Sequence, residues 1–96
     1  MKLYFVPTAR TEIEDAVNYY DERQLGLGTE FRQEVERATN KIAVDPTNLP
    51  FYDRETRICR THRFPYGVIF QVVGTEIWVL AVAHLHRMPG YWKKRD

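Results

Sequence analysis

Cysteine is nearly absent from this 96-residue sequence, and long hydrophobic runs are absent altogether. The one cysteine, Cys59, cannot form an internal disulfide and has no CxxC motif or Cys/His cluster around it, which indicates a reducing compartment. No apolar run approaches the roughly 20 residues of a membrane span, and the N-terminus lacks the charged-then-apolar layout of a signal peptide. We therefore expect a cytoplasmic protein that does not contact membranes.

Net charge is also small, because 14 lysine and arginine residues nearly balance 13 aspartate and glutamate residues. The two halves of the chain differ, however. Residues 1–48 carry 6 basic and 9 acidic side chains, and residues 49–96 carry 8 basic and 4 acidic ones, so charges of −3 and +4 sum to +1. A cationic C-terminal half would suit a polyanion or an acidic protein segment, although scattered, solvated arginines give the same count.

What the chain does have is a composition of 44% hydrophobic and 14% aromatic residues, typical of a folded globular protein. A chain of this length holds enough apolar side chains for one small core, so we expect a single domain over residues 1–96.

The N-terminal half has the pattern of one strand and two helices. A short apolar and aromatic stretch at residues 3–6 predicts a strand. Apolar residues at helical spacing then predict two amphipathic helices, separated by a glycine turn at residues 25–28. Thr8 or Thr11 is expected to cap the first helix, with Glu14 completing a capping box in the second case. Helices joined by so short a turn should lie antiparallel as a hairpin.

The pattern changes after a proline-containing loop at residues 45–50, which ends the second helix. Three strands are predicted beyond it, the last two joined by a Gly74-Thr75 turn: residues 57–64, 66–73 and 76–84. Residues 77–83 are apolar at both odd and even positions, as in a central strand that is covered on both faces. Neither face of residues 57–64 is purely apolar, which is typical of an edge strand. Two helices followed by three strands indicate an α+β fold.

Short stretches along nearly the whole chain form a characteristic series. They are Ala9-Arg10, residues 12–16, Tyr19-Tyr20, residues 26–28 with Phe31 and Val35, residues 64–66, residues 79–82 and residues 84–92. In this order and spacing they resemble the RelE/ParE superfamily, the toxins of bacterial type II toxin-antitoxin systems, some of which serve plasmid stabilization. The resemblance implies a β-α-α-β-β-β order, with the helix hairpin packed on a mainly antiparallel sheet, and a cognate antitoxin as partner.

Family membership alone does not define the chemistry, because the superfamily divides by activity. RelE-like toxins cleave mRNA, usually on the ribosome, and ParE-like toxins inhibit DNA gyrase without being nucleases. The sequence favours a ribosome-dependent, metal-independent mRNA endoribonuclease, an mRNA interferase, by a narrow margin, because it supplies groups for proton transfer. The alternatives are a gyrase inhibitor and a non-toxic member that only binds antitoxin and represses the operon.

Cleavage of RNA through its own 2′-hydroxyl needs a base, positive charge for the phosphorane and an acid for the leaving oxygen. The resemblance places such groups on the sheet and in the C-terminal segment, where this chain has the catalytic candidates His84, Arg87 and Tyr91. The RNA-binding candidates are Arg57, Arg60, Arg63, His86 and Trp92. RelE-like toxins are rich in lysine in the middle of the chain, where this sequence has only arginine, a poor general base.

Each candidate also has a structural interpretation. His84 could hydrogen-bond a neighbouring backbone group at the end of its strand, and Arg87 could form a surface ion pair. Residues 91–92 could stack on RNA bases or fold back to close the sheet. The spacing of His84 and His86 is a weak metal signal without a third ligand, so we expect no metal and no cofactor.

Arg60 and Arg63 could bind phosphates or form ion pairs with Glu55 or Glu76. Whatever the target, ribosome-bound mRNA or gyrase, the resemblance implies an antitoxin encoded beside the toxin. We expect this antitoxin to be acidic or amphipathic and to cover the basic face of the sheet with a helix or an extended segment.

Overall fold

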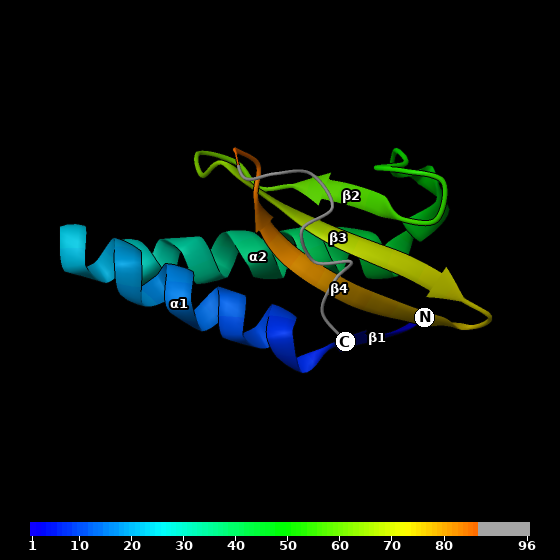
Figure 1. Cartoon of the computed structure of the whole chain (residues 1–96), viewed down its shortest axis with the longest axis horizontal. Coiled ribbons are helices and arrows are strands. Elements are labelled where there is room, and N and C mark those ends of the chain that lie inside the picture. The colour runs from blue at the N-terminus through cyan, green and yellow to red at the C-terminus, as the bar shows by residue number, and fades with distance from the viewer. Residues whose placement is uncertain (87–96) are drawn as a thin grey trace.

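The computed structural model describes residues 1–86, in which two helices pack against one face of a four-stranded sheet (Figure 1). The strands are β1 (Lys2–Phe5), β2 (Arg57–Arg60), β3 (Tyr66–Val73) and β4 (Glu76–His84). The helices are α1 (Pro7–Arg23) and α2 (Leu27–Val44), and a single 3-10 turn, η1 (Pro46–Asn48), follows α2. This order confirms the predicted α+β fold with a helix hairpin on a mainly antiparallel sheet.

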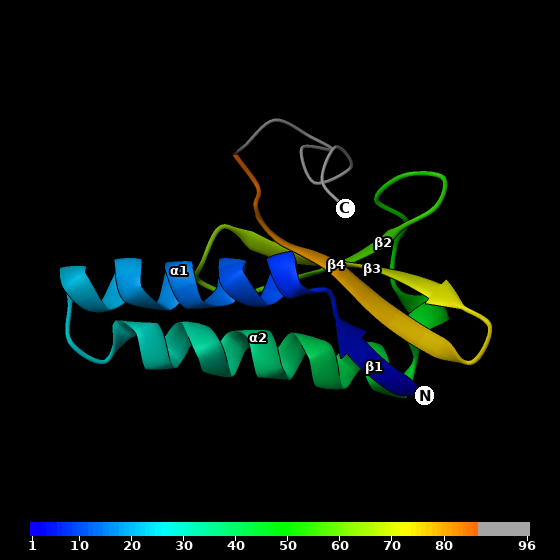
Figure 2. The ribbon, with the colours of Figure 1, turned by 60° about the horizontal axis from the view of Figure 1, so that its bottom comes forward.

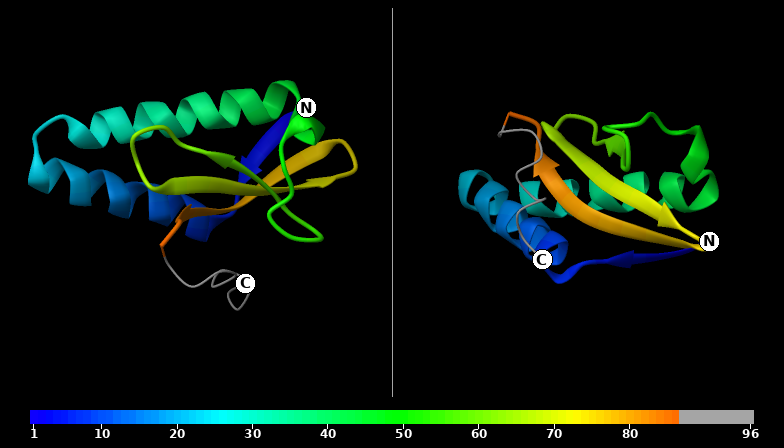
Figure 3. Two further views of the ribbon diagram at one scale, coloured as in Figure 1. Left: turned by 90° about the horizontal axis from the view of Figure 1, so that it is seen from above. Right: turned by 45° about the vertical axis from the view of Figure 1, so that its right-hand side comes forward.

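The sheet has the strand order β1-β4-β3-β2, with β1 parallel to β4 and the other pairs antiparallel (Figure 3). The predicted central strand is therefore β4, and the predicted edge strand is β2. The pairing of β3 with β4 passes directly from Ile69↔Ala81 to Phe70↔Val79, a register shift in which β4 carries one extra residue, Leu80. This irregularity shifts the alternation of β4, so that Val79 and Val82 both face the helices.

The main core lies between the sheet and the helix hairpin (Figure 2). Each helix buries apolar residues spaced three or four apart, as the sequence predicts. They are Ala9, Ile13, Ala16 and Val17 of α1 and Phe31, Val35, Ala38 and Ile42 of α2. They pack on inward-facing residues of β3 and β4, such as Phe70 and Ile77. Neither helix in residues 1–86 is long and apolar enough to cross a membrane.

A smaller apolar cluster lies on the opposite face of the sheet. Its buried members are Ile58, Ile69, Ala81 and Ala83, which come from three adjacent strands. Because successive residues of a strand face opposite sides, β4 contributes to both clusters. This explains why residues 77–83 are apolar at both parities.

The start of α1 differs from the prediction. The helix begins at Pro7, one turn before Thr11, and Val6 is the N-cap residue without any side-chain cap. Proline suits this first helical position because its fixed φ and missing N–H cost nothing there. The Thr11 hydroxyl donates to the Pro7 carbonyl instead, and Glu14 binds Arg32 of α2 through two contacts of 2.8 Å. The predicted capping box is therefore wrong.

Strand β2 is shorter than predicted, ending at Arg60 and not at Phe64. Thr61 turns the chain because its hydroxyl donates to the carbonyls of Phe64 and Tyr66, at 2.9 and 3.1 Å. Arg63 adopts a left-handed conformation with φ 71°, which breaks the strand alternation. As a result Phe64 packs in the main core beneath the helices.

Candidate functional site

The arginines predicted to bind RNA make different contacts, beginning with Arg57 at the edge of the sheet. Its Nη1 donates to the carbonyl oxygen of Leu49 at 2.6 Å. Its guanidinium carbon lies 3.8 Å from the centre of the Phe51 ring, a close cation–π contact. Arg57 therefore holds the loop before β2 in place.

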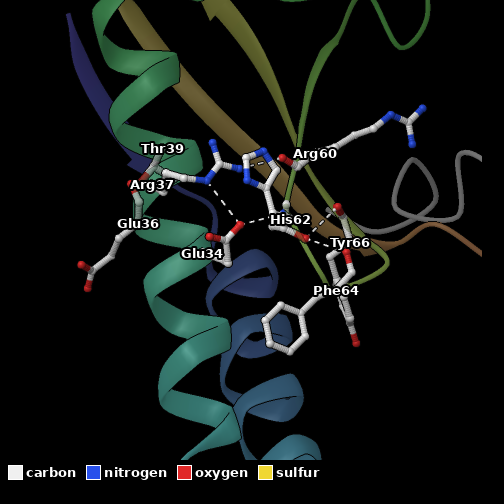
Figure 4. Close-up of polar contacts among 9 residues, drawn as sticks. Glu34, Glu36, Arg37, Thr39, Arg60, His62, Phe64 and Tyr66 are labelled. Atoms are coloured by element: carbon white, nitrogen blue, oxygen red, sulfur yellow. Dashed lines mark hydrogen bonds and ion pairs between the residues drawn. The ribbon is translucent and has the colours of Figure 1, made fainter.

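Arg63 forms an ion pair with Glu30 of α2, and not with the predicted Glu55 or Glu76. Both partners of this pair are substantially exposed. Arg60 is exposed as well, and Figure 4 shows its side chain extending away from α2. Arg57 and Arg63 therefore contact neighbouring groups of the fold, and Arg60 extends from the end of β2.

A network between α2 and the loop after β2 fixes the position of this loop (Figure 4). The His62 N–H donates to Oε1 of Glu34 at 2.6 Å, and the same oxygen accepts from Nε of Arg37 at 3.3 Å. Nη2 of Arg37 donates to the Arg60 carbonyl at 3.0 Å. Burial disfavours ionisation of Glu34, but the contacts from His62 and Arg37 outweigh it and lower the pKa of this carboxyl.

We predict that Glu34→Ala lowers the free energy of unfolding by about 1 kcal/mol at pH 7, because it removes two hydrogen bonds to a charged group. Since the folded pKa of Glu34 is lowered, its contribution is present above the unfolded pKa and disappears as the pH falls through the folded value. Urea denaturation at pH 7 and pH 3 should show a difference from wild type that shrinks in acid. Glu36→Ala, an exposed position on the same helix, is the control. An equal loss at both pH values would contradict this assignment.

His84 lies at the end of β4, half-buried, as predicted for a residue closing the central strand. Its Nδ1 accepts a hydrogen bond from the His86 N–H at 3.2 Å. Its ring centre lies 5.1 Å from the rings of both Tyr66 and His86. The two histidines therefore adjoin one another, with His86 exposed.

The predicted residues Arg87, Tyr91 and Trp92 lie outside the described residues. Among the candidates within residues 1–86, His84 and Arg60 lie on opposite faces of the sheet. His84 is opposite Tyr66, which packs against the main core on the helix side of the sheet. Arg60 shares the opposite face with Ile58, because residues two apart in a strand face the same side.

The structure brings His84 and His86 together with residues that the sequence analysis did not select as a site. Two adjoining cavities, of about 440 and 610 Å³, open where α1 passes the end of β4, and both are lined by Tyr19, Tyr66 and His84. The first also includes Glu12, Asp15 and His86, and the second Tyr20, Arg23 and Pro65. We call these two cavities together the α1–β4 groove.

The groove exists because β1 is shorter than β4. Strand β1 pairs with β4 only as far as Phe5↔Val79, and α1 then runs beside the remainder of β4. Oε1 of Glu12 accepts a hydrogen bond from the Val82 N–H at 2.9 Å, so a carboxylate takes the place of the missing strand. The two residues are 70 positions apart, so no local sequence pattern could have identified their contact.

Cys59 is buried in the main core, and this burial raises the pKa of its thiol. A protonated, inaccessible thiol is a poor nucleophile, so Cys59 has a packing role. Within residues 1–86, no group of three histidine, cysteine, aspartate or glutamate side chains is arranged to hold a metal ion.

The comparisons with known proteins identify the family. A family model described as the ParE toxin of the type II toxin-antitoxin system parDE matches residues 3–89. A chain from the structure of the chromosomal ParDE system of P. aeruginosa is similar, with a TM-score of 0.79 and 17% identity. The match covers 90% of this chain and 97% of that chain. At 17% identity it shows that the two chains share a fold. No curated protein matches the chain. Because the family match spans nearly the whole sequence, this chain belongs to the ParE family of toxins in type II toxin-antitoxin systems.

Proposed function

We propose that this protein inhibits DNA gyrase by binding to it, without nuclease chemistry, and that a cognate antitoxin neutralises it. Membership of the ParE family favours gyrase over the ribosome as the target, and so reverses the order of preference that the sequence suggested. The observation that carries the proposal is the separation of two candidate nuclease groups, His84 and Arg60. His84 faces the helix side of the sheet, and Arg60 faces the other side.

The engagement of the other arginines supports the same conclusion. A nuclease needs positive charge directed at the phosphorane, with little reorganisation as the charge develops. Arg57 is bound to Leu49 and stacked on Phe51, and the charge of Arg63 is offset by Glu30. Arginine is also too basic to act as the general base. The endoribonuclease alternative therefore depends on His84 together with Arg87 and Tyr91.

A gyrase inhibitor acts where bacterial DNA is, so we propose that the protein works in the bacterial cytoplasm. We also propose that residues 1–96 form one toxin domain, because both helices and all four described strands contribute to one main core or to the sheet above it. The antitoxin would then need to cover only this one domain.

A supercoiling assay tests this function. Purified toxin should abolish supercoiling of relaxed plasmid by purified gyrase in a dose-dependent manner, because the toxin occupies the enzyme. Toxin incubated beforehand with equimolar antitoxin should leave supercoiling unchanged, which controls for inhibition by contaminants. Normal supercoiling at a large excess of folded toxin would refute the proposal.

A further inference from the structure

The α1–β4 groove has three chemically distinct parts arranged along α1. Glu12 and Asp15 place two carboxylates at one end, and Arg23 places a guanidinium at the other. Aromatic rings lie between them, contributed by Tyr19, Tyr66 and His84. Asp15 is exposed, and Tyr19 keeps 49% of its surface exposed, so both are available to a partner.

The walls of the groove are held in defined positions. The hydrogen bond from the Val82 N–H orients the Glu12 carboxylate. Tyr66 is fixed by its backbone, since its N–H donates to the Phe64 carbonyl at 2.8 Å and its carbonyl accepts from the Thr61 N–H at 2.9 Å. A site with few groups left to order on binding loses less conformational entropy when it is occupied.

The carboxylates determine which ligands fit. They repel phosphate groups, so the acidic end is unsuited to a nucleic acid backbone. A guanidinium or ammonium group would meet opposite charge at this end and ring faces beside it, the two features that bind such cations. The Tyr19 ring already accepts a cation, because the Arg23 guanidinium carbon lies 4.4 Å from its centre.

From this geometry we propose that the α1–β4 groove binds an extended segment of the antitoxin that carries a basic side chain next to an apolar or aromatic one. The basic side chain pairs with the exposed carboxylate of Asp15, and its apolar neighbour packs on the exposed part of the Tyr19 ring. This inference rests on the proposed function, which supplies the antitoxin. It differs from the expectation of an acidic segment on a basic face, because Arg57 and Arg63 are engaged within the fold.

The test measures the affinity of the purified toxin for the protein encoded by the adjoining reading frame. Asp15→Lys reverses the charge of the acidic end, and Tyr19→Ala removes the exposed ring. Each should weaken binding roughly 10- to 100-fold, as expected for a central contact of an interface. Glu22→Lys makes the same charge change at an exposed position of α1 that does not line the groove, and it should bind like wild type. Circular dichroism confirms that each variant is folded.

The outcomes separate the two proposals. Failure of wild-type toxin to bind the neighbouring protein would remove the antitoxin from the proposed function, and this inference with it. Wild-type affinity in folded Asp15→Lys and Tyr19→Ala, with wild type binding normally, would overturn the groove inference alone. So would variants that keep antitoxin affinity but lose inhibition of gyrase, because the groove would then serve the target. Equal weakening by Glu22→Lys would show a general charge effect and would also overturn it.

Discussion

Replacing Phe31 by alanine should lower the free energy of unfolding by about 3–5 kcal/mol, the range measured for buried phenylalanines. Phe31 is fully buried between the helices and the sheet. Its ring centre lies 5.6, 5.3 and 4.8 Å from those of Tyr20, Phe64 and Tyr66. Truncation removes these contacts and leaves a cavity that the surrounding rings cannot fill. Chemical denaturation followed by far-UV circular dichroism measures the loss.

Phe51→Ala is the matched control, because it deletes the same side chain at a position that is 61% exposed. The Phe51 ring contacts the Arg57 guanidinium, so this variant should cost about 1 kcal/mol or less. Equal losses in the two variants would contradict the assignment of the main core to the space between helices and sheet.

Gly28→Ala should destabilise the protein by about 1–3 kcal/mol through overpacking. A Cβ at this position would clash with the backbone oxygen of Val17 and lie 2.8 Å from Cγ of Asp21. The backbone oxygen belongs to α1 and cannot move alone, so the helices would have to separate. The separation would also disturb the hydrogen bond of 2.8 Å from the Gly28 N–H to Oδ1 of Asp21.

The predicted loss of stability is opposite in sign to what helix propensity alone would give. Within an uncrowded helix the same change would stabilise by up to about 1 kcal/mol, because alanine is the better helix former. Thr29→Ala, at the exposed neighbouring position, should change the stability little. A stabilised Gly28→Ala variant in thermal denaturation would show that the helices do not approach as closely as described.

Most of the fold could be predicted because it follows from local periodicity. Residues 77–83 are apolar at both parities, and β4 is indeed central with buried residues on both faces. The Gly74-Thr75 turn joins β3 and β4 as expected, with Gly74 at φ 61°. The end of β2 could not be predicted in this way. It depends on side-chain bonds of Thr61 and on a left-handed Arg63, neither of which periodicity reveals.

The candidate site was less predictable, because its contacts join residues far apart in the sequence. The partner of Arg63 is Glu30, 33 positions away, whereas the sequence suggested either a phosphate or one of two carboxylates closer in the chain. The position of His84 at the end of β4 was predicted correctly. Its neighbours in the groove come mainly from α1 and could not be inferred, because strand and helix patterns do not specify which helix face lies beside which strand end.

We propose that this ParE-family toxin acts on gyrase by binding and not on RNA by cleavage. The most direct test is one toxin preparation titrated in parallel into a gyrase supercoiling reaction and a translating ribosome reaction, with new 5′ ends on the message mapped by primer extension. We expect the toxin to abolish supercoiling and to leave the message uncut at every dose. Antitoxin should restore supercoiling and should not change the message. New 5′ ends with normal supercoiling would contradict the account and would return His84, with Arg87 and Tyr91, to a catalytic role.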